Sequence, residues 1–193
     1  MIDETNNESA EAGQQAPGPS LVDIMRNPTV EGLAQVLSRF DKGETMADMT
    51  GYPRANLEAM YTNAYNLYTQ GKYAEAMATF GLLMTYNHLD RRYFNGFAAC
   101  LQMQKRYQEA IKYYGLARMF EPRDLMPVLH IAECQLALLQ LPQAQATLLY
   151  LREQIKDEKQ LSALNARVDG VLALIEKNPA TKKDNRGSQH AGN

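Results

Sequence analysis

The sequence predicts an all-α protein in which a helix-turn-helix unit recurs every 34 residues. The residue types of 57–90 return in 91–124 and again in 125–158, with large apolar and small residues at matching places. The shared small positions are Ala64, Ala98 and Ala132, then Ala76, Ala110 and Ala144. Apolar residues make up 45% of the 193 residues, which is enough for a core. Because one such hairpin cannot bury its apolar face alone, the three units are expected to stack.

Residues 1–19 are polar and acidic, and they are expected to be disordered. They contain few large apolar side chains, so they cannot bury enough surface to offset the entropy lost on ordering. They also lack the apolar segment of a secretory signal, which predicts a protein that stays in the cytosol. Apolar runs elsewhere are shorter than the roughly 18 to 20 residues that span a bilayer, so no membrane insertion is expected.

Residues 20–56 are predicted to form short N-terminal helices. Ser20 is suited to cap the first, which Pro28 interrupts, and Thr29 is suited to cap the second. The second helix has one apolar stripe, formed by Val30, Leu33, Ala34, Leu37 and Phe40. This stripe packs either on the repeats or on a second copy of the chain, and in the second case it is a dimer interface. Another short helix is expected at 46–49, and Pro53 suits the first turn of the helix after it.

Residues 159–177 are predicted to form a last amphipathic helix. Its apolar residues are Leu161, Leu164, Val168, Val171, Leu172 and Ile175. Such a helix is expected to cap the apolar face that the third repeat would otherwise expose. Asn178-Pro179 ends it, and residues 178–193 are expected to form a flexible tail.

The three repeats resemble the tetratricopeptide repeat. Equivalent positions alternate between large, small and aromatic residues, and Pro122 stands at a turn between repeats, as in that family. This chain differs from the pattern at Asn63 and at Pro142, and the glycine of the turn is present only as Gly71. The resemblance implies a short right-handed superhelix of three repeats, 57–158 in all, with a concave inner face.

The sequence lacks the motifs of catalytic, metal and cofactor sites. It has no phosphate-binding loop, dinucleotide turn, nucleophile elbow or paired-histidine metal helix, so no enzyme, metal or cofactor is expected. Cys100 and Cys134 are expected to be buried structural thiols, because equivalent places on neighbouring repeats are too far apart for a disulfide. A net charge of −2 leaves no basic face for nucleic acid or an anionic membrane. His130 and Glu133, three residues apart on one helix, leave open an enzyme that transfers protons.

Three tyrosines, Tyr61, Tyr65 and Tyr68, share one face of the first repeat helix. The residue before each of them, namely Met60, Ala64 and Leu67, is expected to be buried. The tyrosines are therefore predicted to line the concave side as a groove for an apolar peptide, although packing against the N-terminal helices is the alternative. Polar and small residues expected along the same groove are Arg92, Asn95, Ala99, Gln102, His130 and Glu133.

A narrower resemblance follows from the motifs of residues 46–175. The segments beginning at Met60, at His88, at Ala98 and at His130 (HIAEC) are similar to the translocator chaperones of bacterial type III secretion systems. The resemblance implies a cytosolic chaperone that binds hydrophobic, pore-forming translocators by an extended segment in the groove and forms a homodimer when free. Departures at Asn87, Arg91 and Asn95 leave the identity of its clients open. The alternative is a general tetratricopeptide scaffold that assembles a soluble complex.

Overall fold

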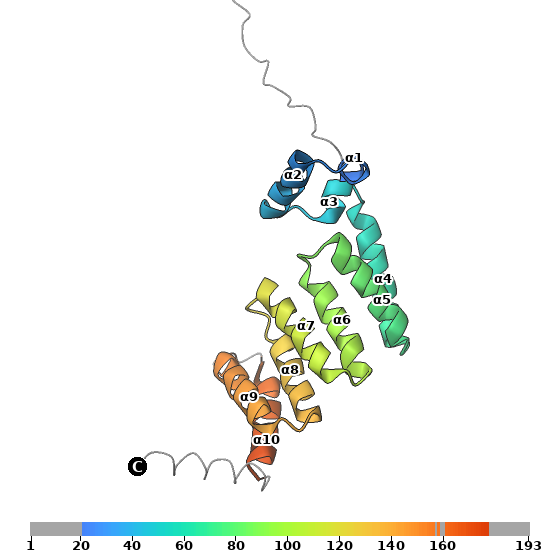
Figure 1. Ribbon diagram of the computed structural model, residues 1–193. Coiled ribbons are helices and arrows are strands. Elements are labelled where there is room, and N and C mark those ends of the chain that lie inside the picture. The colour runs from blue at the N-terminus through green and yellow to red at the C-terminus, as the bar shows by residue number, and fades with distance from the viewer. Residues whose placement is uncertain (1–20, 157, 159–160, 178–193) are drawn as a thin grey trace, which may run out of the picture. The chain divides into compact units, whose positions relative to one another are not determined.

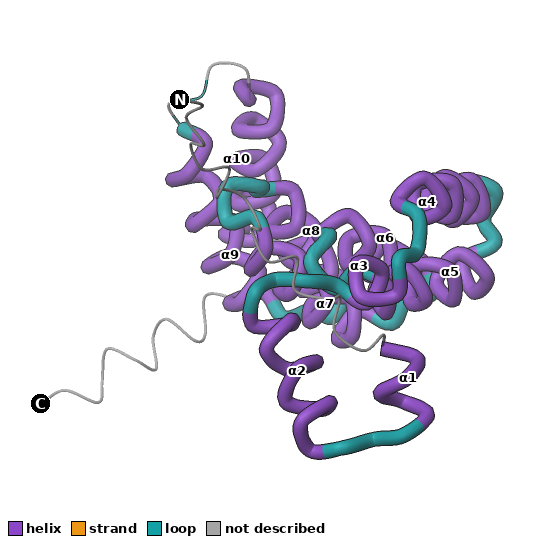
Figure 2. The backbone as a smooth tube through the Cα atoms, turned by 90° about the horizontal axis from the view of Figure 1, so that it is seen from above, coloured by secondary structure: helices purple, strands orange, loops and turns teal. Residues whose placement is uncertain are grey.

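The computed structural model describes residues 21–156, 158 and 161–177, and every secondary-structure element in those residues is a helix (Figure 1; Figure 2). The expectations for residues 1–19 and 178–193, and for Ser20 as a helix cap, fall outside this part of the chain. The chain divides into two compact units, 1–52 and 53–193.

The first unit contains three short helices. They are α1 (Leu21–Arg26), α2 (Val30–Asp41) and α3 (Met46–Thr50). The Thr29 hydroxyl caps α2 by accepting a hydrogen bond from the Gly32 amide at 3.0 Å, as the sequence predicts. Helix α1 packs against both α2 and α3, with Leu21 and Ile24 buried. The three helices thus form a small body around α1.

The second unit contains three helical hairpins and a last helix. The hairpins are α4 (Arg54–Thr69) with α5 (Tyr73–Tyr86), α6 (Arg91–Met103) with α7 (Tyr107–Phe120), and α8 (Met126–Ala137) with α9 (Leu141–Ile155). Each helix packs against the next in the chain, and α4 also contacts α6 (Figure 1). The last helix, α10 (Ser162–Lys177), packs on α9. The hairpins therefore stack in chain order.

Small residues lie at the places where these helices approach most closely. All six shared alanines are completely buried, those at 64, 98 and 132 on the first helices and those at 76, 110 and 144 on the second. Large residues of the second helices, Phe80, Tyr114 and Leu148, fill the space beside them and are at most 2% exposed. The 34-residue period of the sequence is thus the period of the core.

The three hairpin turns share one backbone geometry, although only one contains glycine. Gly71 has φ of 78°, and the residues at the equivalent places, Lys105 and Leu139, have φ of 61° and 59°. In each turn the following amide bonds to a carbonyl five residues earlier, for example Lys72 N to Leu67 O at 2.9 Å. A left-handed residue other than glycine costs roughly 1 kcal/mol or more, so the stacked repeats impose this turn on Lys105 and Leu139.

Helix α10 covers the apolar side of the third hairpin. Its buried residues Val168, Leu172 and Ile175 form one cluster with Leu148 and Leu151 of α9. The two cysteines lie deeper among the repeats, where burial raises the pKa of both thiols to about 11. They are therefore protonated near neutral pH.

Candidate peptide-binding groove

A cavity of about 260 Å³ lies on the inner side of the hairpins, between the first helices of the three repeats. Its walls come from α4, α6 and α8, and its floor comes from α5 and α7. The lining residues are Tyr61, Tyr65, Tyr68, Phe80, Arg92, Asn95, Gly96, Ala99, Tyr114, Met126, Pro127 and His130. We call this surface the groove.

All three tyrosines of α4 line the groove, but they differ in exposure. Tyr65 is 54% exposed, whereas Tyr61 and Tyr68 are half-buried. The Tyr61 ring lies 6.0 Å from the ring of Phe80 and 6.0 Å from that of Tyr93. Two tyrosines are therefore held by neighbouring rings or partial burial, and Tyr65 offers an open aromatic surface.

The buried side of α4 is narrower than the sequence predicts. Ala64 is completely buried, but Met60 and Leu67 are only half-buried, so the face expected to be buried is buried completely only at Ala64. The other fully buried residue of α4 is Leu57. Only one small residue fits at the closest approach, and the larger side chains lie at its edges.

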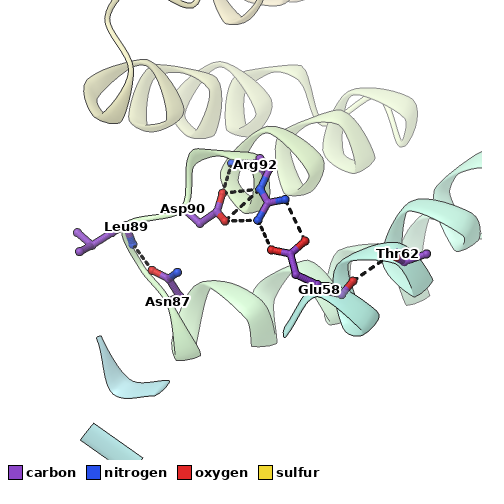
Figure 3. Close-up of polar contacts among 6 residues, drawn as sticks. All are labelled: Glu58, Thr62, Asn87, Leu89, Asp90 and Arg92. Atoms are coloured by element: carbon purple, nitrogen blue, oxygen red, sulfur yellow. Dashed lines mark hydrogen bonds and ion pairs between the residues drawn. The ribbon is translucent and has the colours of Figure 1, made fainter. Parts of the chain in front are cut away.

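At the α4 side of the groove, two carboxylates surround the Arg92 guanidinium (Figure 3). Arg92 donates to Glu58 Oε1 at 2.5 Å and to Asp90 Oδ2 at 2.7 Å, and its guanidinium lies 4.8 Å from the centre of the Tyr61 ring. The hydrogen bond from Arg92 lowers the pKa of Glu58, and those to Asp90 and Glu58 raise the pKa of Arg92. The single charged residue that lines the groove is thus already neutralised.

At the α8 side, a network of side chains holds two rings together. The Tyr114 hydroxyl donates to Gln102 Oε1 at 2.7 Å, and the His130 ring stacks on Tyr114 with centroids 5.0 Å apart. Gln102 Nε2 lies 3.4 Å from Glu133 Oε2, and His130 Nδ1 lies 3.0 Å from the same oxygen. Burial is the main cause that raises the pKa of Tyr114, so its hydroxyl keeps its proton.

Gln102 and Glu133 stand behind the groove and do not line its cavity. Both were predicted as groove residues, and the structure places them as supports of Tyr114 and His130 instead. Glu133 also accepts a hydrogen bond from Arg167 of α10 at 2.9 Å. The hydrogen bond with His130 lowers the pKa of Glu133 despite partial burial. The carboxylate is therefore charged near neutral pH, and it joins α10 to the groove wall.

The described residues contain no group of three or more His, Cys, Asp or Glu side chains that could hold a metal ion. Among the helices of the described chain, none combines the length and the hydrophobicity needed to cross a bilayer.

Comparison with known proteins agrees with these geometric findings. A family model described as "Tetratricopeptide repeat" matches residues 57–90 and 94–120. The low calcium response locus protein H of Yersinia pestis is 32% identical over 133 residues, which cover 69% of this chain and 79% of that protein. A solved structure of the Yersinia enterocolitica type III secretion translocator chaperone SycD aligns with a TM-score of 0.63 and 30% identity, covering 68% of this chain and 98% of SycD. The chain belongs to the type III secretion translocator chaperones.

SycD has also been solved in complex with a peptide of the translocator YopD. That structure aligns with a TM-score of 0.60 and 32% identity, over 63% of this chain and 93% of that one. Another SycD structure is described as an alternative dimer. The all-α tetratricopeptide fold and the membership of this chaperone family, both predicted from the sequence, are confirmed.

The groove of this translocator chaperone includes residues that the sequence does not single out. They are Phe80, Gly96, Tyr114, Met126 and Pro127. Phe80 and Tyr114 share one position of the repeat, and the pattern assigns that position to the core. Gly96 has a steric role, since a Cβ atom there would lie 2.4 Å from the Phe80 ring. Phe80 and Tyr114 therefore belong both to the core and to the floor of the groove. The repeat pattern does not distinguish these two roles.

Proposed function

We propose that this chain is a chaperone of hydrophobic translocator proteins and binds an extended segment of them in the groove. The observation that supports this most directly is the aromatic cavity, which has tyrosines on one wall and Phe80 and Tyr114 as its floor. The structure of SycD, a relative of this chain, has been solved with a peptide of the translocator YopD. In the bacterial cytoplasm, such binding keeps a translocator soluble and competent for secretion until its export.

The rings of the groove suit an apolar client segment. Tyrosine offers a large and rigid surface at low entropy cost, and its hydroxyl stays compatible with water when the groove is empty. Tyr65 is the most exposed of them and is the residue best placed to close over a client side chain. Burying such a ring at the centre of an interface is worth roughly 2 kcal/mol or more.

The charges of the groove favour an internal segment of the client over its C-terminus. A C-terminal carboxylate needs a free cation, and Arg92 is already bound by Glu58 and Asp90. Binding therefore depends on apolar side chains and on backbone hydrogen bonds. We infer a binding role without catalysis, since Glu133 has its oxygens engaged by His130 and Arg167.

The proposal is tested by co-expression of this chain with the translocator of its own secretion system. Wild type is expected to keep the translocator soluble and to co-purify with it. Replacing Tyr65 and Tyr68 together by alanine is expected to leave the helical circular dichroism unchanged and to abolish co-purification. Tyr150→Ala is the matched control, because Tyr150 is an equally large ring on α9 outside the groove.

A general scaffold predicts a different outcome. In that case the tyrosines serve only the fold, so the double variant loses helicity, and any remaining folded protein binds as wild type does. Undiminished co-purification by a folded double variant contradicts the groove as the binding site.

We further propose that residues 20–56 join two copies of the free chaperone through the stripe on α2. Val30, Leu33 and Leu37 are 81%, 53% and 65% exposed, and Phe40 completes the stripe as a half-buried residue. A stripe of exposed aliphatic residues on one helix face is typical of an interaction surface. A second copy fits, because two such stripes are self-complementary about a twofold axis.

Leu33→Glu together with Leu37→Glu is expected to convert a dimer into a monomer, since charges would have to be buried at the interface. Light scattering of the full chain measures the change in mass. Lys42→Glu, a change at the end of the same helix, is the control and should leave the dimer intact. A wild-type monomer would contradict the dimer interface.

A further inference from the structure

The imidazole ring of His130 lines the groove and is held by two neighbouring side chains. Its imidazole stacks on Tyr114, with centroids 5.0 Å apart and planes inclined by 22°. Its Nδ1 atom lies 3.0 Å from Glu133 Oε2, one turn further along α8. The ring is thus fixed by a stacking contact on its face and a hydrogen bond at its edge.

Glu133 also decides which nitrogen of His130 has the proton. A carboxylate accepts hydrogen bonds and does not donate them, and Arg167 at 2.9 Å together with Gln102 keeps this one charged. The depressed pKa of Glu133, which the hydrogen bond with His130 causes, agrees with that state. The neutral imidazole therefore has its proton on Nδ1, and its Nε2 atom has a free lone pair.

Of the two ring nitrogens, Nδ1 contacts Glu133, and Nε2 has no hydrogen-bond partner among the described residues. His130 lines the cavity, and its side chain is 35% exposed. The Arg92 guanidinium at the other side of the groove donates to two carboxylates and has no lone pair to offer. A buried client backbone has N–H groups that need acceptors, and His130 Nε2 is a fixed acceptor beside the apolar floor.

We propose that His130 Nε2 accepts a hydrogen bond from one backbone N–H of the bound translocator segment, and that Glu133 positions it for this by holding the Nδ1–H tautomer. The bond sets the register of the segment, with its apolar anchor over Phe80 and Tyr114. It also excludes proline, which has no N–H, from that one position of the client. This inference rests on the proposed function and adds to it a rule for the sequence of the client.

The tautomer is tested on the free chaperone by nitrogen NMR of histidine in the ¹⁵N-labelled full chain. His130→Phe identifies the signals of His130, because the other histidines, His88 and His190, remain in that variant. In the neutral ring, a protonated Nδ1 with an unprotonated Nε2 is the expected result. A proton on Nε2 of the neutral ring overturns the inference.

The hydrogen bond itself is tested with a synthetic peptide of the translocator segment that co-purifies with the wild-type chain. Each backbone N–H of the peptide is replaced in turn by N-methyl, and affinity is measured by calorimetry. One position is expected to lose about tenfold in affinity for the wild type, the cost of one hydrogen bond. His130→Phe keeps a ring on Tyr114 but has no acceptor, so its affinity for the unmodified peptide is expected to be about tenfold lower.

The combination of the two changes gives the decisive outcome. At the sensitive position, N-methylation should cost His130→Phe less than about twofold, because the bond is already absent. Equal losses in wild type and His130→Phe at every position overturn the inference and leave the proposed function intact. If no translocator segment binds the wild-type chain, the proposed function and this inference fall together.

Discussion

Each side of the groove has a charged cluster, and both clusters contain an ion pair between residues 34 positions apart. Glu58 pairs with Arg92 on the α4 side, and Glu133 pairs with Arg167 on the α8 side. On the α4 side the cation lines the groove, and Glu58 and Asp90 surround it. On the α8 side the anion stands behind the groove, and a histidine lies between it and the cavity.

The difference shows that two ion pairs with the same 34-residue separation can have different consequences for the groove. Arg92 donates hydrogen bonds to carboxylates, and its guanidinium lies over the Tyr61 ring, so that side of the groove presents mainly ring surface. Glu133 uses its acceptors on His130, Gln102 and Arg167, and this leaves a bare nitrogen on the imidazole. The α4 side thus presents mainly ring surface to the cavity, and the α8 side presents the imidazole of His130.

The largest expected effect comes from the floor that both sides share. Gly96→Ala places a Cβ atom 2.4 Å from the Phe80 ring and is expected to destabilise the fold by about 1 to 3 kcal/mol. Urea unfolding measures the loss. Gly115→Ala on α7 is the matched control, since its Cβ meets no atom within 4 Å, and it should be neutral or stabilising by up to about 1 kcal/mol.

Equal stability of the two glycine variants would mean that Phe80 moves aside freely. In that case the floor of the groove is not a rigid support shared by the two charged clusters.

Glu133→Gln is expected to weaken the α8 side by about 1 to 2 kcal/mol in urea unfolding at neutral pH. The change removes a charge that His130 and Arg167 both bind, and it leaves those partners with weaker hydrogen bonds. Glu153→Gln, which alters an exposed pair with Lys156, should cost less than about 0.5 kcal/mol. A similar loss of stability in both variants would mean that the α8 cluster contributes no more than an ordinary surface ion pair.

The pH dependence of stability distinguishes the contribution of the Glu133 charge from that of its side-chain packing. Its pKa in the folded chain is lowered from 4.5, chiefly by the hydrogen bond with His130, so its contribution is present above 4.5 and is lost as the pH falls through the folded pKa. The stability difference between wild type and Glu133→Gln should therefore be largest near neutral pH and shrink as acid protonates the carboxylate. A difference that stays constant down to about pH 3 contradicts a charged Glu133.

Arg92→Met is expected to have the smallest effect on stability, about 1 kcal/mol or less, because its ion pairs are partly exposed. Its effect on the groove should be clearer. Tyr61 loses the guanidinium that lies 4.8 Å from its ring, and Glu58 and Asp90 become uncompensated, so the affinity for an apolar peptide should fall several-fold. Arg106→Met is the control, because it removes a surface ion pair with Glu109 that lies outside the groove.

An unchanged affinity for Arg92→Met would show that the α4 side needs its rings alone. A change as large as that of His130→Phe would mean that the two sides act alike, against the contrast between them.

Much of the fold follows from the period of the sequence. The alanines at 64, 98 and 132 recur every 34 residues because only a small side chain fits where two helices touch, and the structure buries all three completely. The Thr29 cap and the tyrosine face of α4 also follow from local sequence. Helical spacing alone puts Tyr61, Tyr65 and Tyr68 on one face. Such features depend on neighbours within one or two turns, which a sequence specifies directly.

The parts of the groove in which residues from different helices meet could not be predicted without the tertiary structure. Whether Gln102 and Glu133 line the cavity or support it depends on the angles at which α6, α7 and α8 pack, and a repeat pattern does not contain those angles. Phe80 and Tyr114 are core residues whose upper faces become the floor, because Gly96 leaves room above Phe80. Lys105 and Leu139 adopt left-handed turns that their own preferences oppose, since the stacked core outweighs one strained residue. The sequence by itself thus determined the helices, their period and the aromatic face, and only packing between repeats decided which side chains line the groove.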